Sequence, residues 1–181
     1  PLRMQPPAPH TPAHADTVKR GTTVATTALL ARKGAPPLLV PPRAIPEAQL
    51  AEWSREPGIA WHGPTRDAAS VWRDHHVCCL PSRGGEGLPR TLLEGAACAR
   101  AVVTTDVPGC RRLVRDGVEG RIVPPGDAAS LAAILVDLAA DSAAVSRMGE
   151  AARARVLAGF TERAVMDQVK ALWGDMLASP P

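Results

Sequence analysis

The sequence predicts a single α/β domain built on a doubly wound parallel sheet. Short apolar runs such as "VCCL" (77–80) and "AVV" (101–103) lack polar alternation, which is typical of strands buried on both faces of a parallel sheet. Between these runs lie longer segments with apolar residues at helical spacing. A chain of 181 residues has the size of one ordinary domain, so we expect one unit.

The helices and strands can be assigned in chain order from apolar periodicity and turn residues. Pro46 near a first turn and Gly58 beyond a last turn mark one helix, and Pro89 opens another. Strands are predicted at residues 37–40, 59–63, 77–82, 101–106 and 119–125. Helices are predicted at residues 25–34, 45–58, 65–75, 89–100, 109–117 (one turn), 127–140, 142–157 and 161–177. Residues 1–24 are rich in proline and polar residues and predict a loose tail, which leaves 25–181 as the domain.

The composition argues against several classes of protein. With four Trp, one Phe and no Tyr, the chain lacks the exposed aromatics of a nucleic-acid stacking platform, so no nucleic acid is expected as partner. The net charge of +3 comes from scattered arginines, which predicts a solvated surface, with weak attraction to phosphates or an anionic membrane as the alternative.

The sequence also predicts a cytoplasmic protein. The most apolar window, "SLAAILVDLAADSAAV", is interrupted by Asp137 and Asp141, and residues 1–25 lack the apolar run of a signal peptide. Cytoplasmic cysteines stay reduced. Cys78 and Cys79 follow each other in a strand and should point to opposite faces, so we expect no metal site and no cofactor.

The stretch "PSRGGEGLPRTLLE" (81–94) carries the functional hypothesis. It connects a predicted strand to a helix, and ligands of open parallel sheets bind at the carboxyl ends of the strands. Glycines at 84, 85 and 87 allow close backbone approach, and the first turn after Pro89 presents backbone N–H groups. The sequence therefore predicts an anion cradle suited to a phosphate. Thr104 and Thr105 are candidates to line the same cleft, and Asp106 is a candidate N-cap.

Two carboxylates, Glu86 and Glu94, lie on either side of this helix start, and neither has an obvious basic partner beside it. Glu94 is about five residues into the helix, roughly 7.5 Å along its axis at 1.5 Å per residue. That separation suits two ends of an extended ligand better than one acid/base pair. A carboxylate accepts hydrogen bonds from vicinal hydroxyls. Two carboxylates on either side of a phosphate site would therefore bind two sets of hydroxyls, and a ligand with hydroxyls on both sides of its phosphate group is a sugar nucleotide.

The E-x7-E spacing of Glu86 and Glu94, the preceding "LPS" and the following "TTDVPGCRRLVRDGVEGRIVPPGDAASLAA" resemble a known family. They are similar to the C-terminal, donor-binding domain of retaining GT-B glycosyltransferases of family GT4. The resemblance implies a Rossmann-like half-domain with a helical C-terminal end, a UDP- or GDP-linked sugar as donor, no metal, and transfer with retention. It also implies that the last helix crosses to another domain, which would leave part of its apolar face uncovered here.

The resemblance also implies roles for individual residues. Glu94 would hold the nucleotide ribose, and Glu86 would be the catalytic-site carboxylate that meets the donor sugar. The remaining donor contacts would come from Gly85, Gly87, Leu88, Pro89 and Arg90.

The sequence departs from the family pattern in ways that affect activity. The family's pyrophosphate-neutralising Arg and Lys have no match, because Arg32 and Lys33 fall at a different place. An acceptor-binding domain is absent, so we expect the isolated chain to be inactive and to need a protein partner that supplies it. A lipid-linked acceptor or a peripheral membrane location is a further expectation.

Two other functions stay open at the level of sequence. One is a non-catalytic, degenerate sugar-nucleotide-binding protein that retains the ribose contact. The other is a dinucleotide-dependent oxidoreductase, although "GGEG" differs from G-x-G-x-x-G and lies late in the chain.

Overall fold

The computed structural model describes residues 27–29, 38–40, 46–55, 67–85 and 87–178. Five strands form one sheet in the order β2-β1-β3-β4-β5. The strands are β1 (Thr27–Leu29), β2 (Leu38–Val40), β3 (Val77–Leu80), β4 (Ala101–Thr105) and β5 (Gly120–Val123). The helices are α1 (Glu47–Trp53), α2 (Ala68–Arg73), α3 (Arg90–Ala97), α4 (Pro108–Leu113), α5 (Ala128–Ala140), α6 (Ser142–Gly159) and α7 (Glu162–Ala178).

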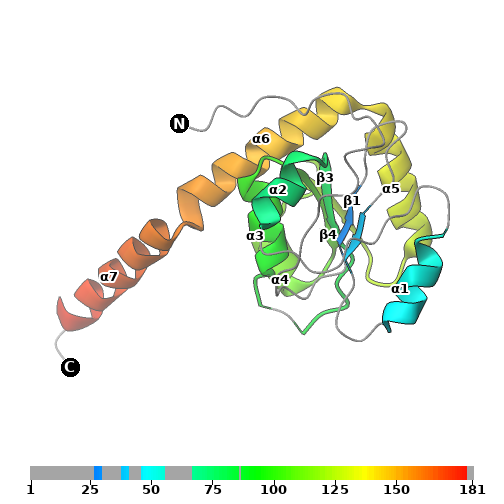
Figure 1. Cartoon of the computed structure of the whole chain (residues 1–181). Coiled ribbons are helices and arrows are strands. Elements are labelled where there is room, and N and C mark those ends of the chain that lie inside the picture. The colour runs from blue at the N-terminus through cyan, green and yellow to red at the C-terminus, as the bar shows by residue number, and fades with distance from the viewer. Residues whose placement is uncertain (1–26, 30–37, 41–45, 56–66, 86, 179–181) are drawn as a thin grey trace.

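The doubly wound arrangement is confirmed for the part of the sheet formed by β3, β4 and β5. These three strands pair in parallel, with Val77 opposite Ala101 and Val102 opposite Gly120. Helices cover both faces (Figure 1). On one face, residues of α2, α3, α4 and the second half of α6 pack together, and on the other, α5 and the first turns of α6 do so.

The expected alternation of the two adjacent cysteines is also confirmed. Cys78 belongs to the first of these core clusters, whereas Cys79 belongs to the second, on the opposite face of β3. Both side chains are fully buried. Successive residues of a strand point to opposite faces, so the two thiols cannot converge on one ion.

Two predictions for the N-terminal part were wrong. Residues 27–29, which we expected in a helix, form β1, and the sheet is not parallel throughout, because β1 runs antiparallel to β2 and to β3. Threonine at 27 favours a strand, since its β-branched side chain fits a pleated surface. Only residues 30–37 separate β1 from β2, and a parallel crossover needs a dozen or more residues. The predicted tail (1–24) and strand (59–63) lie outside the described residues.

Helix α6 crosses the amino end of β4 and therefore lies away from the carboxyl ends of the strands. Gly149 of α6 lies so close to the backbone of Ala99 that a Cβ atom there would collide with the Ala99 carbonyl oxygen. Ala99 itself has a φ of +57°, a conformation that favours glycine. This packing places α6 at one end of the strands, which leaves the carboxyl ends of β3 and β4 away from it (Figure 1).

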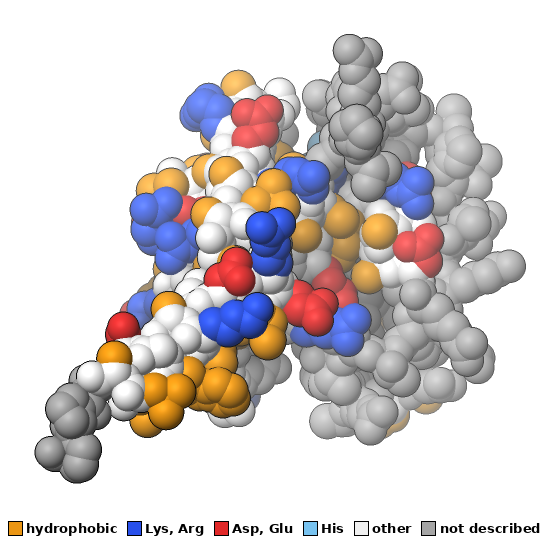
Figure 2. All heavy atoms as spheres, turned by 90° about the vertical axis from the view of Figure 1, so that its left-hand side faces the viewer, with side chains coloured by type: hydrophobic (Ala, Val, Ile, Leu, Met, Phe, Trp, Pro, Cys, Tyr) orange, Lys and Arg blue, Asp and Glu red, His pale blue; other side chains and the backbone are white. Residues whose placement is uncertain are grey.

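The last helix, α7, projects from the body of the molecule (Figure 1). None of its residues is buried, and Trp173 and Leu177 are 64% and 88% exposed. Figure 2 shows hydrophobic side chains gathered on this projecting helix. The expectation that part of its apolar face lies uncovered is confirmed. Within the described residues no single helix is long and apolar enough to cross a membrane, and α5 and α6 reach that length and hydropathy only as a pair bent by 104°.

The loop between α4 and β5 is organised by a buried carboxylate, Glu119. Its side chain accepts hydrogen bonds from the backbone N–H of Arg115 at 2.8 Å and from the Arg115 Nε at 3.0 Å. Burial by itself raises the pKa of Glu119, but the hydrogen bonds and charge of Arg115 outweigh burial and lower that pKa below its ordinary value.

We expect Glu119 to make the free energy of unfolding depend on pH. Because its pKa is depressed in the folded chain, its stabilisation is present above the ordinary glutamate pKa, about 4.3, and is lost as the pH falls through the lower, folded value. Glu119→Gln should cost on the order of 1 kcal/mol at pH 7 and reduce the loss of stability below about pH 4. Urea unfolding between pH 3 and 7 measures both effects. Glu150→Gln, at an exposed position of α6, is the control and should keep the wild-type pH dependence.

Candidate functional site

The candidate site lies at the carboxyl edge of the parallel strands, where β3 leads into α3. Parallel pairing of β3 with β4 brings Leu80 opposite Thr104, so both strands end at the same edge of the sheet. The connection from Pro81 to Pro89 leaves β3 there and returns to α3, which packs on the face of β3 and β4. The expected position of the loop is therefore confirmed.

The loop uses glycine where its backbone needs unusual conformations. Gly84 and Gly85 have φ angles of +110° and +80°, and Gly87 is not in that region. A Cβ atom at any of the three would meet nothing within 4 Å. At Gly84 and Gly85 glycine is thus required by backbone conformation, while no neighbouring atom crowds these positions.

Helix α3 starts as the sequence predicted, with Pro89 as N-cap and Arg90 as its first residue. Pro89 is buried, and the half-buried Leu88 packs against the core. No described side chain caps this helix. Its first backbone N–H groups and the positive end of its dipole therefore face the loop, an arrangement that attracts an anion.

Glu94, the fifth residue of α3, has a basic partner that its sequence neighbours did not predict. Arg90 Nε donates to Glu94 Oε1 at 2.7 Å, because residues four apart lie side by side on a helix. The Arg90 side chain is 77% exposed, whereas that of Glu94 is 24% exposed. An exposed pair of this kind contributes a few tenths of a kcal/mol to stability, so a ligand can compete with it.

The thiol of Cys78 lies behind this part of α3. Burial raises the pKa of Cys78 well above its usual value, and the neighbouring Cys79 and Glu94 raise it further. The thiol is therefore neutral near pH 7 and is not a nucleophile. Among the described residues, no three His, Cys, Asp or Glu side chains are grouped so that they could hold one metal ion.

Thr104 and Thr105 do not line an open cleft, since they are buried at the end of β4. Their hydroxyls donate to the carbonyl oxygens of Leu80 and Ser82, at the end of β3 and in the loop. Asp106 does not cap α4, and its Oδ1 instead accepts from Arg111 Nη1 at 2.6 Å. The pairing of these hydroxyls with carbonyls 23 or 24 residues away depends on strand register, which the sequence does not display.

The predicted site residues fall into two groups. Gly85, Gly87, Leu88, Pro89, Arg90 and Glu94 lie together along the loop and the first turns of α3. Glu86 lies outside the described residues, as do Arg32 and Lys33. The roles predicted for Glu86 and for the residues of the first group stay predictions.

We expect the loop glycines to respond differently to alanine. Gly84→Ala should lower the free energy of unfolding by roughly 1–2 kcal/mol, because its φ of +110° disfavours a side chain. Gly87→Ala, the matched control in the same loop, has no such conformational demand and no crowding, and should leave stability unchanged. Thermal unfolding followed by circular dichroism compares the two. Equal stability of both variants would show that the described loop conformation does not limit stability.

Comparison with known proteins assigns this architecture to a family. The family model described as "Glycosyl transferases group 1" matches residues 22–141. The phosphatidyl-myo-inositol mannosyltransferase of Mycobacterium leprae is 42% identical over 82 residues, 44% of this chain and 22% of that protein. The matching part of the chain thus covers less than a quarter of the length of this relative.

Solved structures show the same fold. Sucrose-phosphate synthase of Thermosynechococcus elongatus superposes with a TM-score of 0.64 at 27% identity, covering 74% of this chain and 34% of that one. Anabaena HepE, crystallised with UDP and glucose, superposes with a TM-score of 0.63 at 21% identity, covering 71% and 35%. The Rossmann-like half-domain expected of a GT-B protein is therefore confirmed, and the chain belongs to the group 1 glycosyl transferase family.

Proposed function

We propose that this chain is the donor-binding half of a glycosyltransferase that takes its sugar from a nucleoside diphosphate donor. The observation that carries the proposal is the glycine loop between β3 and α3, followed by Glu94 as the fifth residue of that helix. Family membership supports sugar transfer, and the bound UDP and glucose in HepE support the type of donor.

The start of α3 would receive the diphosphate. Its first N–H groups and helix dipole attract negative charge, and Gly85 and Gly87 offer an exposed backbone that a phosphate can approach. Arg90 stands at this helix start with an exposed guanidinium. In this arrangement Arg90 would turn from Glu94 toward the phosphate, since their exposed ion pair is weak.

Glu94 would hold the ribose. In the free chain Arg90 donates to Oε1. Once Arg90 has turned to the phosphate, both carboxylate oxygens would be open to the ribose hydroxyls. A carboxylate accepts two vicinal hydroxyls without a change in its own protonation. Glu86, with the N–H groups of Gly87 and Leu88, would meet the sugar and the phosphates next to it.

The proposed reaction is transfer with retention on the front face of the sugar. The bond from the anomeric carbon to the diphosphate oxygen breaks while the acceptor hydroxyl oxygen bonds to the same face of that carbon, and the hydroxyl proton passes to the leaving diphosphate oxygen. An acceptor-binding domain outside this chain would form the other wall of the cleft. Because positioning of both substrates and stabilisation of the leaving diphosphate carry such a reaction, we expect the isolated 181 residues to bind the donor without turnover.

Ligand-observed NMR with UDP, GDP, NAD and inorganic phosphate tests donor binding. We expect UDP or GDP to bind, and Glu94→Ala to weaken that binding at least tenfold, because two hydrogen bonds to a charged acceptor are lost. Glu150→Ala, an exposed carboxylate on α6, is the matched control and should bind as the wild type does.

Each contrary result has a distinct meaning. Equal binding by wild type and Glu94→Ala would exclude the ribose role of Glu94. Preferential binding of NAD would favour the oxidoreductase, and sugar transfer by the isolated chain would contradict the need for an acceptor domain.

A further inference from the structure

The connection from Pro81 to Pro89, called the donor loop from here on, is hydrogen-bonded to the sheet at Ser82. The N–H of Ser82 donates to the carbonyl of Leu80 at 2.9 Å, and its Oγ accepts from the N–H of Gly84 at 3.3 Å. Its carbonyl oxygen accepts from Thr105 Oγ1. The first two bonds stay within the loop and the end of β3. Only the third of these bonds connects the loop to another strand.

Thr105 is placed to be a rigid donor. It is 1% exposed and is the last residue of β4, the strand that pairs with both β3 and β5. Its β-branched side chain has few rotamers, and the backbone on both sides of its peptide is held by Val107 N–H to the Thr105 carbonyl and Asp106 N–H to the Val123 carbonyl, each at 2.8 Å. The Thr105 hydroxyl is therefore held in one position, from which it donates to the loop.

The loop beyond Ser82 depends on this tie. Gly84 and Gly85 are exposed and have the largest conformational freedom of any residue, so they do not hold a loop by themselves. A Cβ at either position would touch nothing within 4 Å, which means that packing does not hold them either. At the β3 end of the loop, the position of residues 83–85 is thus set at Ser82, while Leu88 and Pro89 pack at the α3 end.

We propose that Thr105 is a positioning residue for the donor loop, and that its hydroxyl, through the Ser82 carbonyl, holds residues 82–85 where the loop meets the donor diphosphate. This inference rests on the proposed function for its ligand. Thr105 touches no donor atom in this arrangement and acts only through Ser82. The hydroxyl of its neighbour Thr104 donates to the carbonyl oxygen of Leu80, which belongs to β3 and not to the loop.

Three variants separate positioning from packing. Thr105→Val keeps the shape of the side chain and removes its hydroxyl, whereas Thr105→Ser keeps the hydroxyl and removes a methyl group. Thr104→Val removes the neighbouring buried hydroxyl. Its partner, the Leu80 carbonyl, still accepts from Ser82 N–H, so it is the matched control.

We expect Thr105→Val to weaken UDP or GDP binding about tenfold in calorimetric titrations, while Thr105→Ser and Thr104→Val stay within about threefold of the wild type. Amide hydrogen exchange without ligand should become at least tenfold faster at residues 83–85 in Thr105→Val alone. Affinity or exchange that follows side-chain volume, with serine worse than valine, would overturn the proposal. Equal affinity and exchange in wild type and Thr105→Val would overturn it as well.

The exchange measurement keeps this inference distinct from the proposed function. If the wild type binds no nucleotide, the proposed function fails and the assignment of a ligand to the loop fails with it, while exchange still decides whether Thr105 holds the loop. If Thr105→Val does not fold, Thr105→Cys replaces it, because a thiol is a weaker donor than a hydroxyl. Loop amide exchange in Thr105→Cys should then be faster than in the wild type and in Thr105→Ser. Wild-type exchange in a folded Thr105→Cys would then overturn the proposal.

Discussion

The parallel pairing of β3 with β4, buried on both faces, is the constraint on which the candidate site depends. Every residue of both strands is buried, and their apolar side chains alternate between the two core clusters. Because parallel strands end at one edge, the loops after Leu80 and Thr105 lie next to each other there, although they are far apart in the sequence. A shift of register by one residue would turn Cys78 and Val102 out of their core and move the loop hydroxyls away from their carbonyl partners.

The position of α3 follows from a close approach to β3. A Cβ atom at Gly95 would lie 2.7 Å from the Cβ of Cys78, so glycine at this position lets the helix sit nearer the strand than another residue would allow. Gly95 is the residue after Glu94. The side chain of Glu94 stays partly exposed, at 24%.

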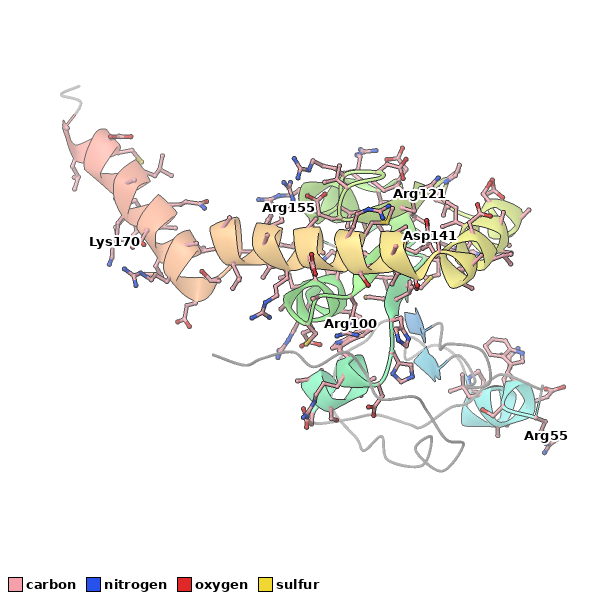
Figure 3. All side chains as sticks on the ribbon, turned by 90° about the horizontal axis from the view of Figure 1, so that it is seen from above. Arg55, Arg100, Arg121, Asp141, Arg155 and Lys170 are labelled. Atoms are coloured by element: carbon pink, nitrogen blue, oxygen red, sulfur yellow. The ribbon has the colours of Figure 1, made fainter. Side chains whose placement is uncertain are left out.

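Three basic residues of the described part of the chain, Arg55, Arg100 and Lys170, do not share one surface. Figure 3 shows Arg55 just after α1, Arg100 ahead of β4 and Lys170 on α7, on separate parts of the molecule. Arg100 is also buried, where burial lowers its pKa and its guanidinium donates to the carbonyl oxygens of His75 and Cys98. In the proposed function, the attraction of an anion comes from local groups, the start of α3 and Arg90, rather than from net charge.

Local patterns were enough to predict much of this protein. The apolar runs, Pro89 and the glycines of the loop determined β3, β4, β5, the start of α3 and the place of Glu94, because each depends on residues close in sequence. Tertiary structure alone decided the antiparallel direction of β1 and β2, the burial of Thr104 and Thr105, and the bond from Thr105 to Ser82. These features arise between segments distant in sequence, where strand register and packing, and not local propensity, select the partners.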